Sequence, residues 1–268
     1  MRRIFNNFEA MLYSVLSLIM ISPFIYMLVT SLQETFSPFL ISLDLKNYSL
    51  NNYIKLINMS GFHKWVLNSF FISISGALLT LIVCSLGAYA FVVKRYKHKN
   101  LILIILMGSL TIPFEATVVP LWLMMGKMNL IDSYLPLILP IPNVLGLLLI
   151  RNAILELPKE VFESAKLDGC SDFKIFTSIV LPVIKPILIT VGILYFTRSW
   201  NSFLWPLIIS NTDSTKTLTV GLAALQGNVD VNYGITMAGS MLSFLPPFII
   251  YITMQKSYIS GLSGSVKN

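Results

Sequence analysis

The sequence predicts an all-α membrane protein with about six transmembrane helices, and three observations carry this prediction. The 268 residues are 55% hydrophobic, only 12% of them are charged, and the mean hydropathy is +0.76. An ordinary soluble domain has about 25% charged residues. Charges are also absent from long stretches of this chain, and a helix of roughly 18 or more apolar residues can cross a bilayer.

The candidate spans follow one another along the chain. Five segments contain no Asp, Glu, Lys or Arg: residues 10–33, 65–93, 101–114, 133–150 and 231–255. The third reaches the length of a span only if it continues past Glu115, because residues 116–126 are again uncharged. A sixth segment, from about residue 181 to 205, is flanked by Lys185 on its loop side and interrupted by Arg198. The first segment is too long for the apolar part of a secretory signal, so we expect it to be retained.

The basic residues are distributed unevenly between the two sides that these spans define. Thirteen of the 19 lie at the termini or in the second and fourth loops, five lie in the other loops, and Arg198 lies within a span. Lys and Arg accumulate on the cytoplasmic side of membrane proteins, so we expect both termini in the cytoplasm. Topology therefore accounts for the net charge of +7, and nucleic-acid binding is not needed to explain it.

Cysteine and histidine give no sign of a disulfide or a metal site. Cys84 lies in the second predicted span and Cys170 in the fourth loop, far apart along the chain. His63 and His98 each lack a second residue at the spacing of a metal ligand. We expect two structural thiols and two solvated histidines.

The fourth loop has the pattern of a helix, a tight turn and a second helix. Leu157-Pro158 is typical of a helix start, Gly169 stands where a left-handed cap ends a helix, and Ser171 is a suitable N-cap for the next one. The first helix is amphipathic, with an apolar face formed by Val161, Phe162 and Ala165. It is too short to bury that face alone, so either its own bundle, the lipid interface or a soluble partner must cover it.

Residue spacing in this loop resembles the EAA loop of ABC importer permeases. The family pattern is EAA, Gly after three more residues, and I-x-L-P after nine more. Here Glu163-Ser164-Ala165 is followed by Gly169 and by Ile179-Val180-Leu181-Pro182, and only Ser164 departs from the pattern. Further segments resemble, in the same order, the sugar-import branch that includes the inner maltose permease subunit. These segments are residues 112–122, 157–169, 200–209, 217–223, 237–251 and 261–268. The terminal Asn268 departs from the usual Gly.

The resemblance implies a type I ABC importer permease fold in three parts. Residues 1–65 would form the first transmembrane helix and an outer loop, residues 66–258 the permease core with its EAA loop at 151–182, and residues 259–268 a cytoplasmic tail. It also implies the partners: a second permease subunit, two ATPase subunits and an extracytoplasmic solute-binding protein. The location would be a bacterial inner membrane. The chain would be no enzyme and would bind no cofactor, because the ATPase would hold ATP and Mg. Consistent with this, the sequence has no G-x-x-x-x-G-K-[ST] phosphate loop.

In this family the EAA loop couples closure of the ATPase to opening of the transport path. The resemblance assigns this coupling to eight residues, namely Glu163, Ser164, Ala165, Asp168, Gly169, Ile179, Leu181 and Pro182. The substrate would be a sugar or oligosaccharide.

Four residues in or near the spans are candidates for the transport path. Ionisable groups inside a membrane are functional candidates, and Glu115 and Arg198 are of this kind. Trp200 and Asn201, with Trp205, would suit a sugar, because aromatic faces pack on sugar rings and amides bond hydroxyl groups. Structural pairing or anchoring at the interface is the alternative for the two charges, and an aromatic belt is the alternative for the tryptophans.

Other functions remain open at this point. An ABC importer permease for a non-sugar solute has the same sequence features. An ion-coupled secondary transporter would need paired carboxylates within the membrane and symmetric broken helices, whereas this chain has one such acid and no visible repeat. A membrane enzyme would need a cluster of catalytic side chains, and none is evident.

Overall fold

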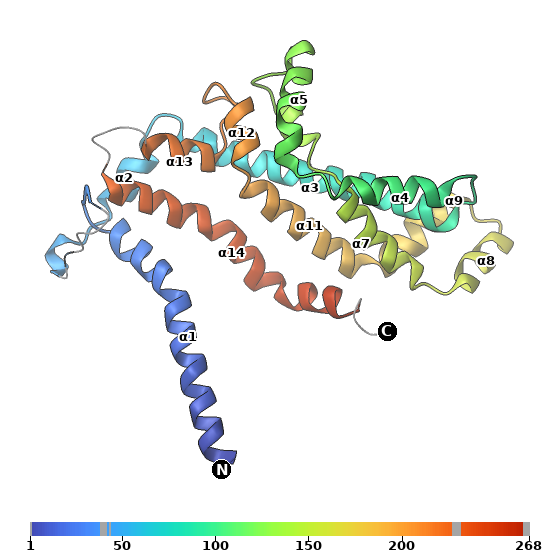
Figure 1. Ribbon diagram of the computed structural model, residues 1–268, viewed down its shortest axis with the longest axis horizontal. Helices are drawn as coiled ribbons and strands as arrows, with labels where there is room; N and C mark the ends of the chain where they lie inside the picture. Colours follow the sequence, from blue (N-terminus) through green and yellow to red (C-terminus); the bar gives the residue numbers. More distant parts are fainter. Residues whose placement is uncertain (1, 38–41, 43, 227–231, 265–268) are drawn as a thin grey trace. The chain divides into compact units, whose positions relative to one another are not determined.

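The computed structural model describes residues 2–37, 42, 44–226 and 232–264 (Figure 1). Throughout these ranges the backbone is helical or irregular, apart from one isolated bridge between Gln33 and Tyr48. The all-α prediction is confirmed. The last part of the predicted tail, residues 265–268 with Asn268, lies outside the described residues. Two compact units are present, and each is described by itself.

The first unit comprises Met1–His63 and Val220–Pro246. Its helices are α1 (Arg2–Ser31), η1 (Leu45–Asn47), α2 (Asn51–Ile57), most of α13 (Leu218–Gln226) and the first part of α14 (Tyr233–Gly264). Buried Asn52 joins its segments, because its side-chain amide donates to the carbonyls of Ser31 and Gln33 at 2.9 and 2.8 Å and accepts from Asn232 at 2.9 Å. A fully satisfied buried amide of this kind fixes one arrangement of the backbone around it.

The second unit comprises Lys64–Thr219 and Pro247–Asn268. Its elements are α3 (Phe62–Val93), α4 (Lys99–Ser109), α5 (Phe114–Lys127), α6 (Tyr134–Ile138), α7 (Val144–Leu155), α8 (Lys159–Leu167), α9 (Asp172–Ile175), the π-helical turn η2 (Phe176–Val180), α10 (Leu181–Val183), α11 (Lys185–Trp200) and α12 (Leu204–Ile209). An apolar cluster of Ile72, Val118, Leu137 and Trp205 joins α3, α5, α6 and α12. The indole N–H of Trp205 donates to the carbonyl of Pro136 at 2.7 Å, so this buried polar group is satisfied.

Apolar helices occur in each of the six predicted spans, but several are broken, and among the described residues at most five spans are long enough to cross a membrane. Three are individually long enough to cross a membrane: Glu9–Ser31, Phe62–Val93 and Tyr233–Met254. Two further pairs reach the length of a span only together, α4 with α5 across a 98° bend and Asp172–Val183 with α11 across a 79° bend. Helix α7 is a shorter apolar helix that begins in the fourth predicted span and extends five residues past its predicted end at residue 150.

Proline accompanies each of the breaks within the second unit. Pro113 has a ψ of 141° and is the N-cap of α5. Pro140 and Pro142 lie between α6 and α7, and Pro186 lies in the first turn of α11. Proline has no N–H to donate and its ring clashes with the preceding helical turn, so it ends a helix and is well placed at the start of the next one.

Candidate functional site

The tip of the EAA loop is a well-formed helix–turn–helix, which we call the knob (residues 158–173). Helix α8 ends at Leu167 with Asp168 as its cap, and Gly169 follows with a φ of +75°. The amides of Gly169 and Cys170 donate to the carbonyls of Lys166 and Ala165, both at 3.0 Å. These two bonds form a Schellman motif, which satisfies carbonyls that the helix end would otherwise leave free. The predicted left-handed cap at Gly169 is confirmed.

The second half of the knob also begins as the sequence predicts. The Ser171 hydroxyl accepts from the amide of Lys174 at 3.3 Å and caps α9. The predicted start of α8 at Leu157-Pro158 is slightly early, because Pro158 has a ψ of 138° and is itself the N-cap. Lys94, at the end of α3, forms an ion pair with Asp172, which ties the start of α9 to α3.

The exposed apolar side chains of the knob are not the ones that form the predicted apolar face. Ala165 is only 5% exposed and Val161 and Phe162 are half-buried, so the chain itself covers much of the predicted apolar face. In contrast, Leu167 is 89% exposed and Phe173 is 72% exposed, on either side of the turn. Sequence reasoning missed both residues, although the signal was available: two large apolar side chains flank a polar turn.

The remaining candidate coupling residues divide between the surface of the knob and the return segment. Glu163, Ser164 and Asp168 are exposed on the knob. Ile179 and Leu181 are half-buried, and Pro182 is exposed. Ile179 lies in the π-helical turn η2. Such turns are rare in proteins, and those that occur are often found at functional sites.

A cavity of about 320 Å³ lies within the second unit, and it brings together two of the four path candidates. Glu115 and Arg198 both line it. Each charge is stabilised by its own helix, since Glu115 lies in the first turn of α5 and Arg198 in the last turn of α11. The Arg198 guanidinium also lies over the ring of Tyr195, 6.0 Å from its centre.

The other two path candidates lie elsewhere. Trp200 is 1% exposed and packs against Phe70 and Phe196, with ring centres 4.7 and 5.8 Å away. Asn201 is exposed and caps the end of α11. Trp205 does line the cavity, together with Phe114.

Sequence reasoning missed the polar residues of the cavity wall. Tyr195, Ser199 and Ser202 line the cavity with Arg198, and Asn143 joins them from the start of α7. The signal was the helical spacing of residues 195, 198, 199 and 202, which places them on one face of α11 and of the turn that follows it.

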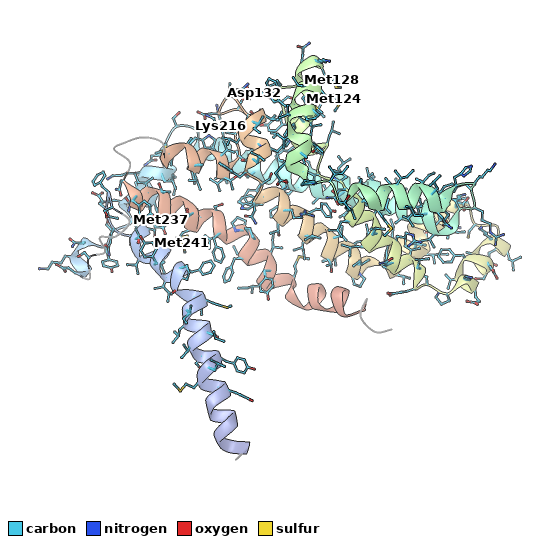
Figure 2. The ribbon with its side chains drawn as sticks, in the orientation of Figure 1. Met124, Met128, Asp132, Lys216, Met237 and Met241 are labelled. Atoms are coloured by element: carbon cyan, nitrogen blue, oxygen red, sulfur yellow. The ribbon has the colours of Figure 1, made fainter. Side chains whose placement is uncertain are left out.

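A separate polar cluster fixes the loop between α12 and α13. Asp132 accepts hydrogen bonds from the amides of Asn211 and Thr212 at 3.0 and 3.2 Å and from the hydroxyls of Thr212, at 2.8 Å, and Thr215. Figure 2 shows Asp132 beside the loop that carries Lys216. From α3, the Asn68 amide donates to the carbonyl of Lys216 at 2.8 Å. Burial alone would raise the pKa of Asp132, but these hydrogen bonds outweigh it and lower the pKa below its usual value.

Comparison with known proteins gives one family and several long matches. Residues 86–258 match the family of the binding-protein-dependent transport system inner membrane component. The arabinooligosaccharides transport system permease protein AraQ of Halalkalibacterium halodurans is 37% identical over 227 residues, covering 84% of this chain and 81% of that protein. The lactose transport system permease protein LacG of Rhizobium radiobacter is 30% identical over 95% of both chains.

A solved structure has the same fold. The crystal structure of a bacterial ABC transporter involved in the import of the acidic polysaccharide alginate matches with a TM-score of 0.82 and 23% identity. The match covers 95% of this chain and 96% of that chain. The predicted type I permease fold is therefore confirmed.

Proposed function

Because this chain belongs to the family of the binding-protein-dependent transport system inner membrane component, we propose that it is the permease subunit of an ATP-driven importer for a saccharide. A second permease subunit would pair with it, a solute-binding protein would deliver the substrate from outside, and two ATPase subunits would bind ATP and Mg. The observation that carries the proposal is the family match over 86–258, which includes the whole EAA loop.

The chemistry of the cavity supports a saccharide as substrate. Glu115 offers hydrogen-bond acceptors, Arg198 offers donors, and Ser199 and Ser202 offer both. Phe114 and Trp205 add aromatic surface. This mixture suits a ligand with many hydroxyl groups and apolar ring faces, and about 320 Å³ is within the usual range of roughly 300–1,000 Å³ for small-molecule pockets. Relatives named for arabinooligosaccharides and lactose favour the same class.

The knob supports coupling through the EAA loop. Leu167 and Phe173 place two large apolar side chains in solvent on a turn held by the Schellman motif and the Ser171 cap. Exposed apolar side chains on a rigid element are typical of a docking surface, and we assign this surface to a cleft in the ATPase. Glu163 and Asp168 would flank the contact, while Ala165 packs within the permease itself.

Reconstitution of the whole complex tests the function. Proteoliposomes would contain this chain, a second permease and the ATPase. The binding protein would be supplied on the side of the membrane where it docks, together with labelled arabinooligosaccharide or lactose. We expect uptake that requires ATP on the ATPase side. Uptake that ignores ATP and follows an imposed ion gradient would instead identify a secondary transporter.

The substitution Leu167→Ser tests the docking surface. Because Leu167 is 89% exposed, its loss leaves the fold of the permease intact, and we expect the amount of co-purified ATPase to fall about tenfold. Leu155→Ser is the matched control, because Leu155 is also exposed but lies at the end of α7, outside the knob. Equal recovery of ATPase with both variants would remove Leu167 from the interface.

A further inference from the structure

A buried tyrosine and an exposed asparagine join the helices that precede and follow the knob. The Tyr195 hydroxyl, on α11, donates to the side-chain oxygen of Asn143 and accepts from the amide of Gly146 at 2.8 Å. The same Asn143 oxygen accepts from the amide of Leu145 at 3.0 Å. We call this set of bonds the arm link. Its bond between Tyr195 and the amide of Gly146 is buried, since Tyr195 is 1% exposed and Gly146 is buried, whereas Asn143 is exposed.

The arm link caps one helix with a side chain from the other. The first amides of any helix have no partner within it. In α7, Asn143 satisfies the amide of Leu145 in the usual way of an N-cap, whereas the amide of Gly146 is satisfied by Tyr195 from α11. Movement of α11 relative to the start of α7 would therefore leave a buried N–H without a partner, which is costly.

Close packing around Gly146 makes the link stiff as well as polar. A Cβ atom at Gly146 would lie 3.1 Å from the Tyr195 ring and hydroxyl and 3.2 Å from the sulfur of Cys84. The Cys84 thiol in turn donates weakly to the carbonyl of Asn143 at 3.5 Å. Because backbone and ring are already in contact, the two helices cannot slide closer, and the hydrogen bonds oppose their separation.

The position of the link relates the knob to the cavity. Helix α7 leads into the knob and α11 leads out of the return segment, and the two pack side by side (Figure 1). At about 1.5 Å per residue, Asn143 and Tyr195 lie roughly 15–18 Å along α7 and α11 from the ends of these helices at the loop. Asn143 and Tyr195 both line the cavity, so the link is at the far end of α7, beyond the middle of α11, and in the wall of the cavity.

We propose that Asn143 and Tyr195 are positioning residues that make α7 and α11 move as one body. A displacement of the knob would then move the cavity wall by the full distance, because neither helix could shift without the other. This rests on the proposed function. Without the link, the two helices can move separately. ATP hydrolysis then continues, but each hydrolysis event opens the cavity less than it does in the native complex. A purely structural role would instead change the amount of intact complex and leave the ATP used per saccharide unchanged.

The test compares two tyrosines that differ in their hydroxyl partners. Tyr195→Phe removes the hydroxyl of the link. Tyr89→Phe is the matched control, because the Tyr89 hydroxyl is also buried in the second unit and has no hydrogen-bond partner among the described residues. In the reconstituted complex, we expect Tyr195→Phe to raise the ATP hydrolysed per saccharide about fivefold to tenfold, and Tyr89→Phe to leave this ratio unchanged.

A second pair of variants keeps the test decisive if Tyr195→Phe prevents assembly. Asn143→Ala removes the one oxygen that accepts both bonds and is expected to raise the ratio. Asn143→Asp keeps an oxygen that can accept both bonds and is expected to preserve it. The double variant of Tyr195→Phe with Asn143→Ala should be no worse than the more severe single variant, because both remove the same link.

The outcomes separate the two proposals. Absence of ATP-driven uptake by the native complex would overturn the proposed function itself. Native uptake, together with unchanged ratios in Tyr195→Phe and Asn143→Ala, would overturn the arm link and leave the proposed function standing.

Discussion

Gly169 is the residue whose role follows most directly from its backbone. Its φ is +75°, a conformation that costs other residues about 1–2 kcal/mol. A Cβ atom there would meet no atom within 4 Å. The requirement for glycine is therefore conformational and not steric, and it was predictable because a helical pattern ends there in a polar turn.

We expect Gly169→Ala to destabilise the knob by about 1 kcal/mol. Hydrogen exchange of the amides in 159–175 would measure this as roughly fivefold faster opening. Gly108→Ala is the control, because a Cβ at Gly108 also meets no atom within 4 Å but the residue lies within α4 with an ordinary helical φ. That variant should leave exchange in the knob unchanged; equal effects from both would mean that the turn is not under conformational constraint.

Single residues also mark the limit of what spacing can predict. Trp200 and Trp205 are five residues apart and both suited a sugar, yet only Trp205 lines the cavity. Leu167 and Ala165 belong to the same short helix, but one is exposed and the other buried. Which side of a helix faces its own chain depends on the neighbours that tertiary packing brings, and spacing within one helix carries no information about them.

At the scale of elements, the polar cluster around Asp132 holds three segments together. It joins the turn between α5 and α6, the loop 211–217 and the start of α3. Beside it, the indole N–H of Trp65 donates to Asp213 at 3.2 Å. Bonds to Lys216 and Trp65 lower the pKa of the Asp213 carboxyl. The cluster therefore depends on ionised carboxylates.

We expect the contribution of Asp132 to stability to be lost in acid. Because its pKa is lower in the folded protein than in the unfolded chain, the unfolded chain binds more protons in that range, and stability falls as pH falls. The contribution is complete at neutral pH and declines from the usual Asp pKa down to the lowered one.

Thermal unfolding in detergent at pH 7 and near pH 3 would measure this loss for the native protein and Asp132→Asn. The substitution should lower the midpoint at pH 7, and the difference from the native protein should shrink in acid. Glu156→Gln, which changes an exposed carboxylate outside the cluster, is the control. A difference that persists undiminished near pH 3 would show that the Asp132 charge is not what holds the loop.

Elements with strong apolar patterns were predictable, and their breaks were not. Pro113 and Pro140 lie at two of the breaks, but the 98° turn between α4 and α5 could not be predicted from the sequence, because hydropathy reports composition and not direction. The π-helical turn η2 has no sequence signature of its own. Within this turn, the Phe176 ring packs against Tyr89 with centres 5.3 Å apart.

At the scale of the whole molecule, fold class and family follow from hydropathy and from the spacing of the EAA loop. The orientation in the membrane rests on the distribution of Lys and Arg alone. That distribution predicts a cytoplasmic knob, on the side where an ATPase would bind. The chain itself contains a probe for this orientation, because Cys170 lies directly after Gly169 in the knob and is half-exposed, whereas Cys84 is buried in α3.

We therefore expect a membrane-impermeant maleimide to label the native protein in inside-out vesicles and not in right-side-out vesicles. Cys170→Ser should abolish the labelling, because burial keeps Cys84 from reacting. Adding the ATPase to inside-out vesicles should slow the labelling of Cys170 severalfold if the knob is its docking site. Labelling confined to right-side-out vesicles would invert the topology, and with it the assignment of the knob to the ATPase.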